Sequence, residues 1–280
     1  MSGRLYVGTS GFAYPDWTPE FYPSGTRPSD LLRRYAERLP ACELNNTFYR
    51  QPSAAAIDGW LAATPSTFRF AVKAQRGGSL RALFGDDPVA SVAWLTEPLA
   101  QFGNRLGAVL FRLPAEVEHD EDRLRALLAA WPMELPLSLE FRHPSWHREE
   151  TFALLRAYGA VLCTTELDTS AGDPAPPEAP AIGLTGSFAY LRLRRESYTP
   201  AELVGWADRI VPVLERGSDA YVFFRHDATG LAATRALTLS ALVADRENAG
   251  DAAGQPGDQP RLPGEPRVPG EPRDPGSATG

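Results

Sequence analysis

The chain alternates between short strand-like segments and longer helix-like segments over most of its length. The strand-like segments are runs of β-branched and aromatic residues, and they cover residues 5–8, 42–45, 68–73, 108–112, 137–141, 160–164, 188–193 and 221–224. The helix-like segments have apolar residues spaced three and four apart, and they cover residues 29–38, a stretch after 53, 88–102, 120–131, 147–158, 200–215 and 230–243. A Pro-rich loop at 173–180 is expected to replace the sixth helix. Such alternation indicates a parallel sheet, because parallel strands need long crossover connections.

Eight strands predict that this sheet closes on itself. The predicted fold class is therefore α/β, a (β/α)8 TIM-type barrel that forms a single domain over residues 1–244. The alternative is an open doubly wound sheet, which usually carries a Gly-rich phosphate loop after its first strand. The loop that begins at Gly8 reads Gly-Thr-Ser-Gly-Phe-Ala-Tyr and does not fit that pattern.

Residues 245–280 differ in composition from the rest of the chain. They consist mainly of Pro, Gly and charged residues, and the segment Pro-Gly-Glu-Pro-Arg occurs twice. Because large apolar side chains are almost absent, this segment cannot offset the entropy of ordering. The sequence predicts a disordered Pro/Gly-rich tail.

Composition limits the partners and the compartment. The formal net charge of -7 disfavours a general attraction to nucleic acid or to anionic membranes. No apolar run approaches the roughly 20 residues that span a bilayer, and the first residues lack the pattern of a secretory signal. Cys42 and Cys163 lie far apart in strand-like segments and are expected to be buried thiols. A cytoplasmic protein is the expectation.

Ionisable residues stand at the ends of most predicted strands, where barrels of this kind place their active sites. Glu43 and Glu140 are the candidate general acid and base. Lys73 is the single lysine in a chain whose Lys and Arg residues total 28. One interpretation pairs Lys73 with Glu43 across neighbouring strands, and the other makes its amine a base or a Schiff-base nucleophile.

A second group of residues is predicted to bind the substrate. They are polar or aromatic and stand at strand ends or in the loops that follow: Ser10, Tyr14, Trp17, Asn45, Arg142, His143, Arg192 and His226. Arg142 and Arg192 are expected to clamp an anion, whereas Arg112 and Arg194 are expected to form ion pairs in the barrel wall. No ligand spacing indicates a metal site, and no motif identifies a cofactor.

Several segments, in order, resemble a known family. They are Gly8-Thr-Ser-Gly-Phe-Ala-Tyr-Pro-Asp-Trp17, Phe21-Tyr-Pro23, Glu43-Leu-Asn-Asn-Thr-Phe-Tyr-Arg50, Phe70-Ala-Val-Lys73, Leu113-Pro114, Glu140-Phe-Arg-His-Pro-Ser-Trp146, Tyr190-Leu-Arg192 and Tyr198. Over residues 4–243 the chain is similar to the YecE-like family, domain of unknown function 72. The resemblance implies a barrel and supplies no established reaction, substrate or cofactor.

Three functions remain open at this point. The first is an enzyme acting on a small polar or anionic metabolite by hydrolase, isomerase or lyase chemistry, in a pocket at the carboxyl ends of the strands. The second is a non-catalytic protein that binds a metabolite in the same pocket. The third is a nucleic-acid processing enzyme that uses the arginines as a phosphate track. The sequence leaves the oligomeric state open.

Overall fold

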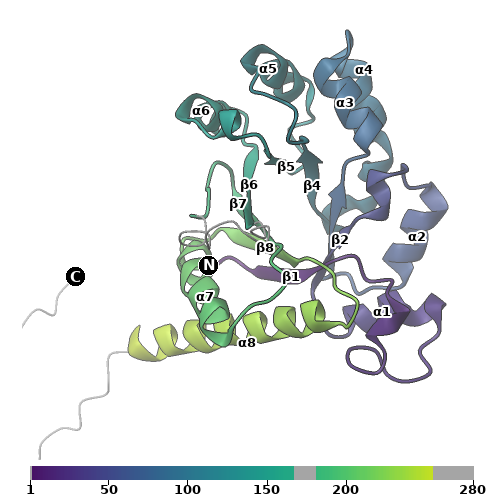
Figure 1. Ribbon diagram of the computed structural model, residues 1–280, viewed down its shortest axis with the longest axis vertical. Helices are drawn as coiled ribbons and strands as arrows, with labels where there is room; N and C mark the ends of the chain where they lie inside the picture. The colour runs from purple at the N-terminus through teal and green to yellow at the C-terminus, as the bar shows by residue number, and fades with distance from the viewer. Residues whose placement is uncertain (1, 167–180, 255–280) are drawn as a thin grey trace, which may run out of the picture.

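The computed structural model, which describes residues 2–166 and 181–254, is a closed barrel of parallel strands surrounded by helices (Figure 1). The strands are β1 Leu5–Ser10, β2 Ala41–Leu44, β3 Arg69–Lys73, β4 Leu106–Arg112, β5 Leu137–Glu140, β6 Val161–Glu166, β7 Phe188–Leu193 and β8 Asp219–Phe224. β1 pairs in parallel with both β2 and β8, which closes the sheet. The predicted (β/α)8 fold is confirmed, and the open-sheet alternative is excluded.

Helices connect the strands on the outside of the barrel. The α-helices are α1 Leu31–Ala36, α2 Ala54–Ala62, α3 Arg76–Phe84, α4 Pro88–Thr96, α5 Glu121–Ala130, α6 Glu149–Ala157, α7 Pro200–Glu215 and α8 Leu231–Gly254. Short 3-10 helices are η1 Pro15–Trp17, η2 Pro28–Asp30, η3 Asn46–Phe48, η4 Glu97–Arg105 and η5 Pro144–Trp146. The predicted Pro-rich loop at 173–180 lies outside the described residues.

Helix α8 extends beyond the predicted end of the domain at residue 244. It continues to Gly254, so the predicted boundary falls inside it. Contacts with the barrel accompany the extra turns, since Arg246 Nε donates to Asp208 of α7 at 2.5 Å. These last turns need few apolar residues, because they extend a helix that is already packed on the barrel and has passed its costly nucleation step. Residues 255–280, the rest of the predicted tail, lie outside the described residues.

Helix α3 was not predicted from the sequence. It contains two consecutive glycines, which lower helix propensity, and the Gln75 side chain caps it by accepting from the Gly78 amide at 2.6 Å. A Cβ built at Gly78 would lie 2.6 Å from both Leu95 Cδ2 and the Trp94 ring of α4. Gly78 therefore permits a close approach of α3 to α4, and this tertiary contact outweighs the local propensity.

The barrel interior is apolar and aromatic over most of its length and polar at the carboxyl ends of the strands. Apolar side chains from seven of the eight strands, which we call the apolar plug, fill the first part: Tyr6, Ala41, Ala71, Ala108, Leu110, Val161, Cys163, Phe188, Tyr190, Tyr221 and Phe223. The Tyr6 and Tyr221 rings stack with centroids 4.9 Å apart. Because every second residue of a strand faces inward, the next inward positions towards the carboxyl ends hold the candidate site. The apolar plug thus separates that site from the opposite end of the barrel.

The close packing at Gly78 makes a stability prediction. We expect Gly78→Ala to lower the free energy of unfolding by about 1–3 kcal/mol, because the added methyl group overpacks the contact with α4. Gly59→Ala is the matched control, since a Cβ there meets nothing within 4 Å and the residue lies inside α2. The control should be neutral or stabilising by about 0.5–1 kcal/mol. Urea unfolding of both variants measures the difference, and equal effects would contradict this account of α3.

Candidate functional site

At the carboxyl ends of the strands, which form the mouth of the barrel, lies a ring of polar side chains, each contributed by a different strand. Its members are Ser10, Glu43, Lys73, Arg112, Glu140, Thr165 and Arg192. Five of the sequence-predicted residues, Ser10, Glu43, Lys73, Glu140 and Arg192, therefore lie at or near the carboxyl ends of their strands. We refer to these seven residues as the polar ring.

Glu43 is the most completely bonded member of the polar ring. It has no exposed surface, and its Oε1 accepts from Ser10 Oγ at 2.8 Å and from an Arg192 terminal nitrogen at 2.7 Å. Its Oε2 accepts from Tyr190 Oη and from Arg192 Nε, both at 2.9 Å. Burial alone would raise the pKa of Glu43, but the Arg192 guanidinium outweighs burial and lowers it to about 2. This carboxylate remains ionised and makes a poor proton donor near neutral pH.

Arg192 joins the two buried carboxylates. Besides its two bonds to Glu43, its other terminal nitrogen donates to Glu140 Oε2 at 2.7 Å. The side chain is 2% exposed, and all three of its nitrogens are committed to carboxylates. This arrangement leaves Arg192 inside the wall of the site, so the expected clamping of an anion by Arg192 has no support in the geometry.

Glu140 has two further neighbours in the polar ring. Thr165 Oγ1 donates to Glu140 Oε1 at 3.2 Å. Arg112 Nε lies 3.3 Å from Glu140 Oε2, which is ion-pair distance, yet this buried nitrogen has no aligned hydrogen-bond acceptor among the described residues. The ion pair expected for Arg112 is thus present. Arg194 is half-buried just beyond β7 and makes no ion pair within 4 Å in the described part of the chain.

Lys73 differs from the other charged members of the polar ring. The residue is 7% exposed, and its Nζ lies 4.1 Å from the centroid of the Phe48 ring. No carboxylate in residues 2–166 and 181–254 lies within ion-pair distance of Nζ, so the ion pair considered between Lys73 and Glu43 is not formed. In the sheet register Glu43 is opposite Ala71, which places Lys73 one inward position nearer the mouth. Burial, reinforced by the charge of Arg192 and only partly opposed by Glu43, lowers the pKa of Lys73 to about 8.

Two predicted aromatic residues stack over the mouth of the barrel. The Tyr14 and His226 rings are parallel with centroids 4.9 Å apart, and Tyr14 Oη donates to the Ser10 carbonyl at 3.1 Å. Burial and the negative charge of Glu43 raise the pKa of Tyr14 to about 12. Burial and the neighbouring Arg194 lower the pKa of His226.

Four other predicted residues lie away from the polar ring. Trp17 is fully buried behind Tyr14, and its indole Nε1 donates to the Asp227 carbonyl at 2.9 Å, so it anchors a loop and does not face a ligand. His143 caps η5, because its Nδ1 accepts from the Ser145 amide at 3.2 Å. Asn45 is half-buried at the start of η3, and Arg142 is exposed beside Arg112.

Tyr190 and Arg76 were not predicted as site residues. Tyr190 belongs to the apolar plug, but its hydroxyl reaches Glu43, and its position two residues before Arg192 on one strand face was a usable signal. Arg76 begins α3 and lines a cavity at the mouth. Because α3 itself was not predicted, no sequence signal placed Arg76 near the polar ring.

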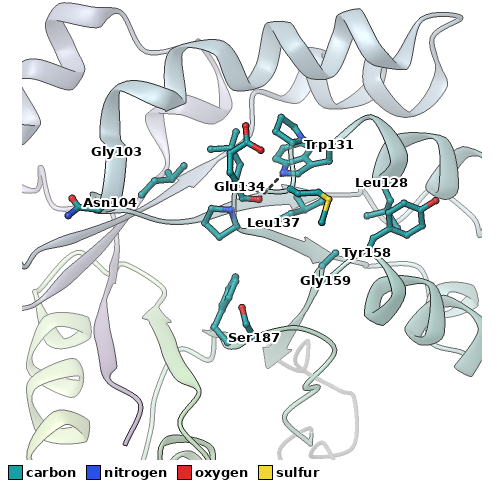
Figure 2. Close-up of a pocket in the computed structure, with 16 residues that line it drawn as sticks. Gly103, Asn104, Leu128, Trp131, Glu134, Leu137, Tyr158, Gly159 and Ser187 are labelled. Atoms are coloured by element: carbon teal, nitrogen blue, oxygen red, sulfur yellow. Dashed lines mark hydrogen bonds between the residues drawn. The ribbon is translucent and has the colours of Figure 1, made fainter. Parts of the chain in front are cut away.

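Two cavities lie at opposite ends of the barrel. One of 250 Å³ lies beside the polar ring, among the loops that follow β2 to β5, and is lined by Phe48, Arg76, Leu80, Arg112, Pro114, Ala115, Glu116 and Arg142. A larger one of 430 Å³ lies at the amino-terminal ends of β4, β5 and β7 (Figure 2). Its labelled residues include Trp131, Leu128 and Leu137, and Glu134 is the single charged side chain among the described residues of its lining. Ionisable groups suited to chemistry gather at the smaller cavity.

The described residues contain no group of three or more His, Cys, Asp and Glu side chains placed to hold a metal ion. Both cysteines are buried and free, as expected. Among the helices described here, none is both long and apolar enough to cross a membrane.

The buried pair of Glu43 and Arg192 makes a pH prediction. Because the pKa of Glu43 is lower in the folded protein than the ordinary 4.5, its ionisation stabilises the fold above that value, and this stabilisation is lost as pH falls towards about 2. Glu43→Gln should lower the free energy of unfolding by about 3–5 kcal/mol at pH 7, since it leaves Arg192 short of a partner. It should also flatten the loss of stability between about pH 5 and 2. Urea unfolding across this pH range measures both effects.

The control for this prediction is Glu37→Gln. Glu37 forms exposed ion pairs with Arg33 and Arg34, and such pairs contribute about 0–1 kcal/mol. The same acid dependence in the wild type and in Glu43→Gln would show that Glu43 does not have the lowered pKa.

Comparison with known proteins agrees with this architecture. The UPF0759 protein YunF of Bacillus subtilis (strain 168) is 23% identical over an alignment of 277 positions, which covers 85% of this chain and 94% of the relative. A DUF72 family protein of Thermotoga maritima has a similar solved structure, with a TM-score of 0.73, 29% identity, and coverage of 86% of this chain and 99% of that one. A DUF72 protein of Enterococcus faecalis V583 has the same fold, with a TM-score of 0.69 and 18% identity over 86% of this chain and 95% of that one. The family model for the protein of unknown function DUF72 matches residues 6–260, and the chain therefore belongs to the DUF72 family.

Proposed function

We propose that this protein is an enzyme that acts on a small anionic metabolite through the amine of Lys73. One observation carries the proposal: a nearly buried lysine stands at the mouth of a barrel without a carboxylate partner among the described residues. A lysine held for stability alone would normally be paired or extended to solvent, because burying an unpaired ammonium group is costly. The position instead suits a group that must be deprotonated in order to react.

The carboxylates are less suited to be the reactive groups. Both oxygens of Glu43 accept two hydrogen bonds each, two of them from Arg192. A general acid or base must exchange its proton with a ligand, and this carboxylate has no open position from which to do so. Glu140 is also buried, and it accepts from Arg192 and from Thr165. We therefore assign Glu43 and Glu140 to holding Arg192, and this revises the expectation that either glutamate acts as the base.

A pKa of about 8 makes roughly one tenth of the Lys73 side chains neutral at pH 7. A neutral amine can accept a proton from a carbon acid. It can also attack a carbonyl carbon to form an imine, with the carbonyl oxygen leaving as water. Arg192 and Arg112 lower the pKa of Lys73, and Arg112 supplies positive charge for an anionic ligand. Aldol-type cleavage and isomerisation are the reaction classes that use both properties.

The single lysine allows its pKa to be measured directly. Protein labelled with carbon-13 at lysine Cε should give one lysine resonance, which we expect to titrate with a pKa of about 8. This measurement needs no substrate and no chemical modification of the lysine. The Lys73→Arg variant should lack the resonance. A titration near 10.5, the ordinary value for lysine, would contradict the proposal.

The amine can also be trapped chemically. We expect borohydride to fix an adduct on Lys73 when the protein is incubated with small anionic carbonyl compounds, because hydride reduces the imine to a stable secondary amine. Intact mass and peptide mapping locate the adduct and separate it from reaction at the chain's amino terminus. Lys73→Arg should lose it. Turnover of a carbonyl compound without any adduct on Lys73 would remove the imine chemistry.

A further inference from the structure

We propose that the 250 Å³ cavity beside the polar ring binds the phosphoryl group of the ligand, between the guanidinium groups of Arg76, Arg112 and Arg142. The inference rests on the proposed function in one respect, since it assigns the bound phosphate to the compound that meets Lys73. It replaces the expectation that Arg192 forms half of an anion clamp.

The cavity contains more positive than negative charge. Arg76 comes from the start of α3, Arg112 from the end of β4, and Arg142 from the loop after β5. Among the described residues of the lining, Glu116 is the only acidic one. Neither Arg76 nor Arg142 forms an ion pair within 4 Å in the described part of the chain, and the buried Arg112 Nε has no aligned hydrogen-bond acceptor there. Three guanidinium groups facing one carboxylate suit a dianion better than a carboxylate ligand.

The local electrostatics support an anion at this position. Burial lowers the pKa of Arg112, and the neighbouring Arg142 and Arg192 lower it further, against the pull of Glu140. Arg76 is the first residue of α3, where the positive end of the helix dipole disfavours a cation. Both unfavourable terms become favourable when an anion lies between the arginines. The three arginines repel one another, and an anion bound between them would relieve this repulsion.

The cavity is connected to Lys73 by shared residues. The Phe48 ring lines the cavity and also contacts the Lys73 amine at 4.1 Å. Arg112 likewise lines the cavity and reaches Glu140 of the polar ring at 3.3 Å. A volume of 250 Å³ is below the roughly 300–1,000 Å³ typical of pockets that hold a whole ligand. The cavity therefore fits one end of a ligand whose other end extends towards Lys73.

Binding of inorganic phosphate tests the site without any assumption about catalysis. Calorimetric titration at constant ionic strength should show saturable binding to the wild type and at least tenfold weaker binding to the double variant Arg76→Gln, Arg142→Gln. Arg216→Gln is the matched control, because this exposed arginine follows α7 at the opposite end of the barrel. The control should bind phosphate as the wild type does. Absence of saturable binding, or equal affinity in all three proteins, overturns the proposed site.

A pair of aldehydes connects the site to Lys73. Glycolaldehyde phosphate and glycolaldehyde differ only in the phosphoryl group, and borohydride trapping should label Lys73 at least tenfold faster with the phosphorylated compound. The double variant should lose this preference while still reacting with glycolaldehyde. Equal labelling rates in the wild type overturn the link between cavity and amine. Phosphate binding without any Lys73 adduct contradicts the imine chemistry of the proposed function and leaves the phosphate site standing, so the two failures are distinguishable.

Discussion

The site depends on one guanidinium group that holds two carboxylates inside a closed barrel. Arg192 donates to Glu43 and Glu140 from all three of its nitrogens, at distances of 2.7 to 2.9 Å. Burial of three charges is costly unless each is paired, and here the hydrogen bonds from Ser10, Tyr190 and Thr165 complete the pairing. This network of buried charges lies between the apolar plug and the mouth of the barrel.

Lys73 lies next to this network but takes no part in the ion pairs of Arg192 with Glu43 and Glu140. Arg192 satisfies the carboxylates that would otherwise hold the lysine ammonium, and its own charge disfavours that ammonium further. Burial and Arg192 thus lower the pKa of Lys73 to about 8. Because the arginines remain charged at every physiological pH, Lys73 is the cation of the polar ring that can change its protonation state. The structural network and the proposed reactive group are therefore two consequences of one arrangement of charge.

Local patterns predicted most of the strands and the helices that carry strong signals. Helix α7 matches its predicted range at both ends, since Thr199 and Glu202 form a capping box that is legible in the sequence. Helix α3 escaped prediction because Gly77 and Gly78 are poor helix formers, and its stability depends on contact with α4. Arg76, which lines the proposed phosphate site, escaped with it. Trp17 was misplaced in the mouth because burial behind Tyr14 has no signature in a loop sequence.

The sequence by itself determined the number of strands, because runs of β-branched and aromatic residues are local signals. The ends of these runs placed Glu43, Lys73, Glu140 and Arg192 at or near the carboxyl ends of their strands. Only the tertiary structure decided the partners. Arg192 of β7 reaches Glu43 of β2 across β8 and β1, because closure of the barrel brings inward side chains of non-adjacent strands together. Which cation satisfies which carboxylate, and which amine stays unpaired, follows from that closure.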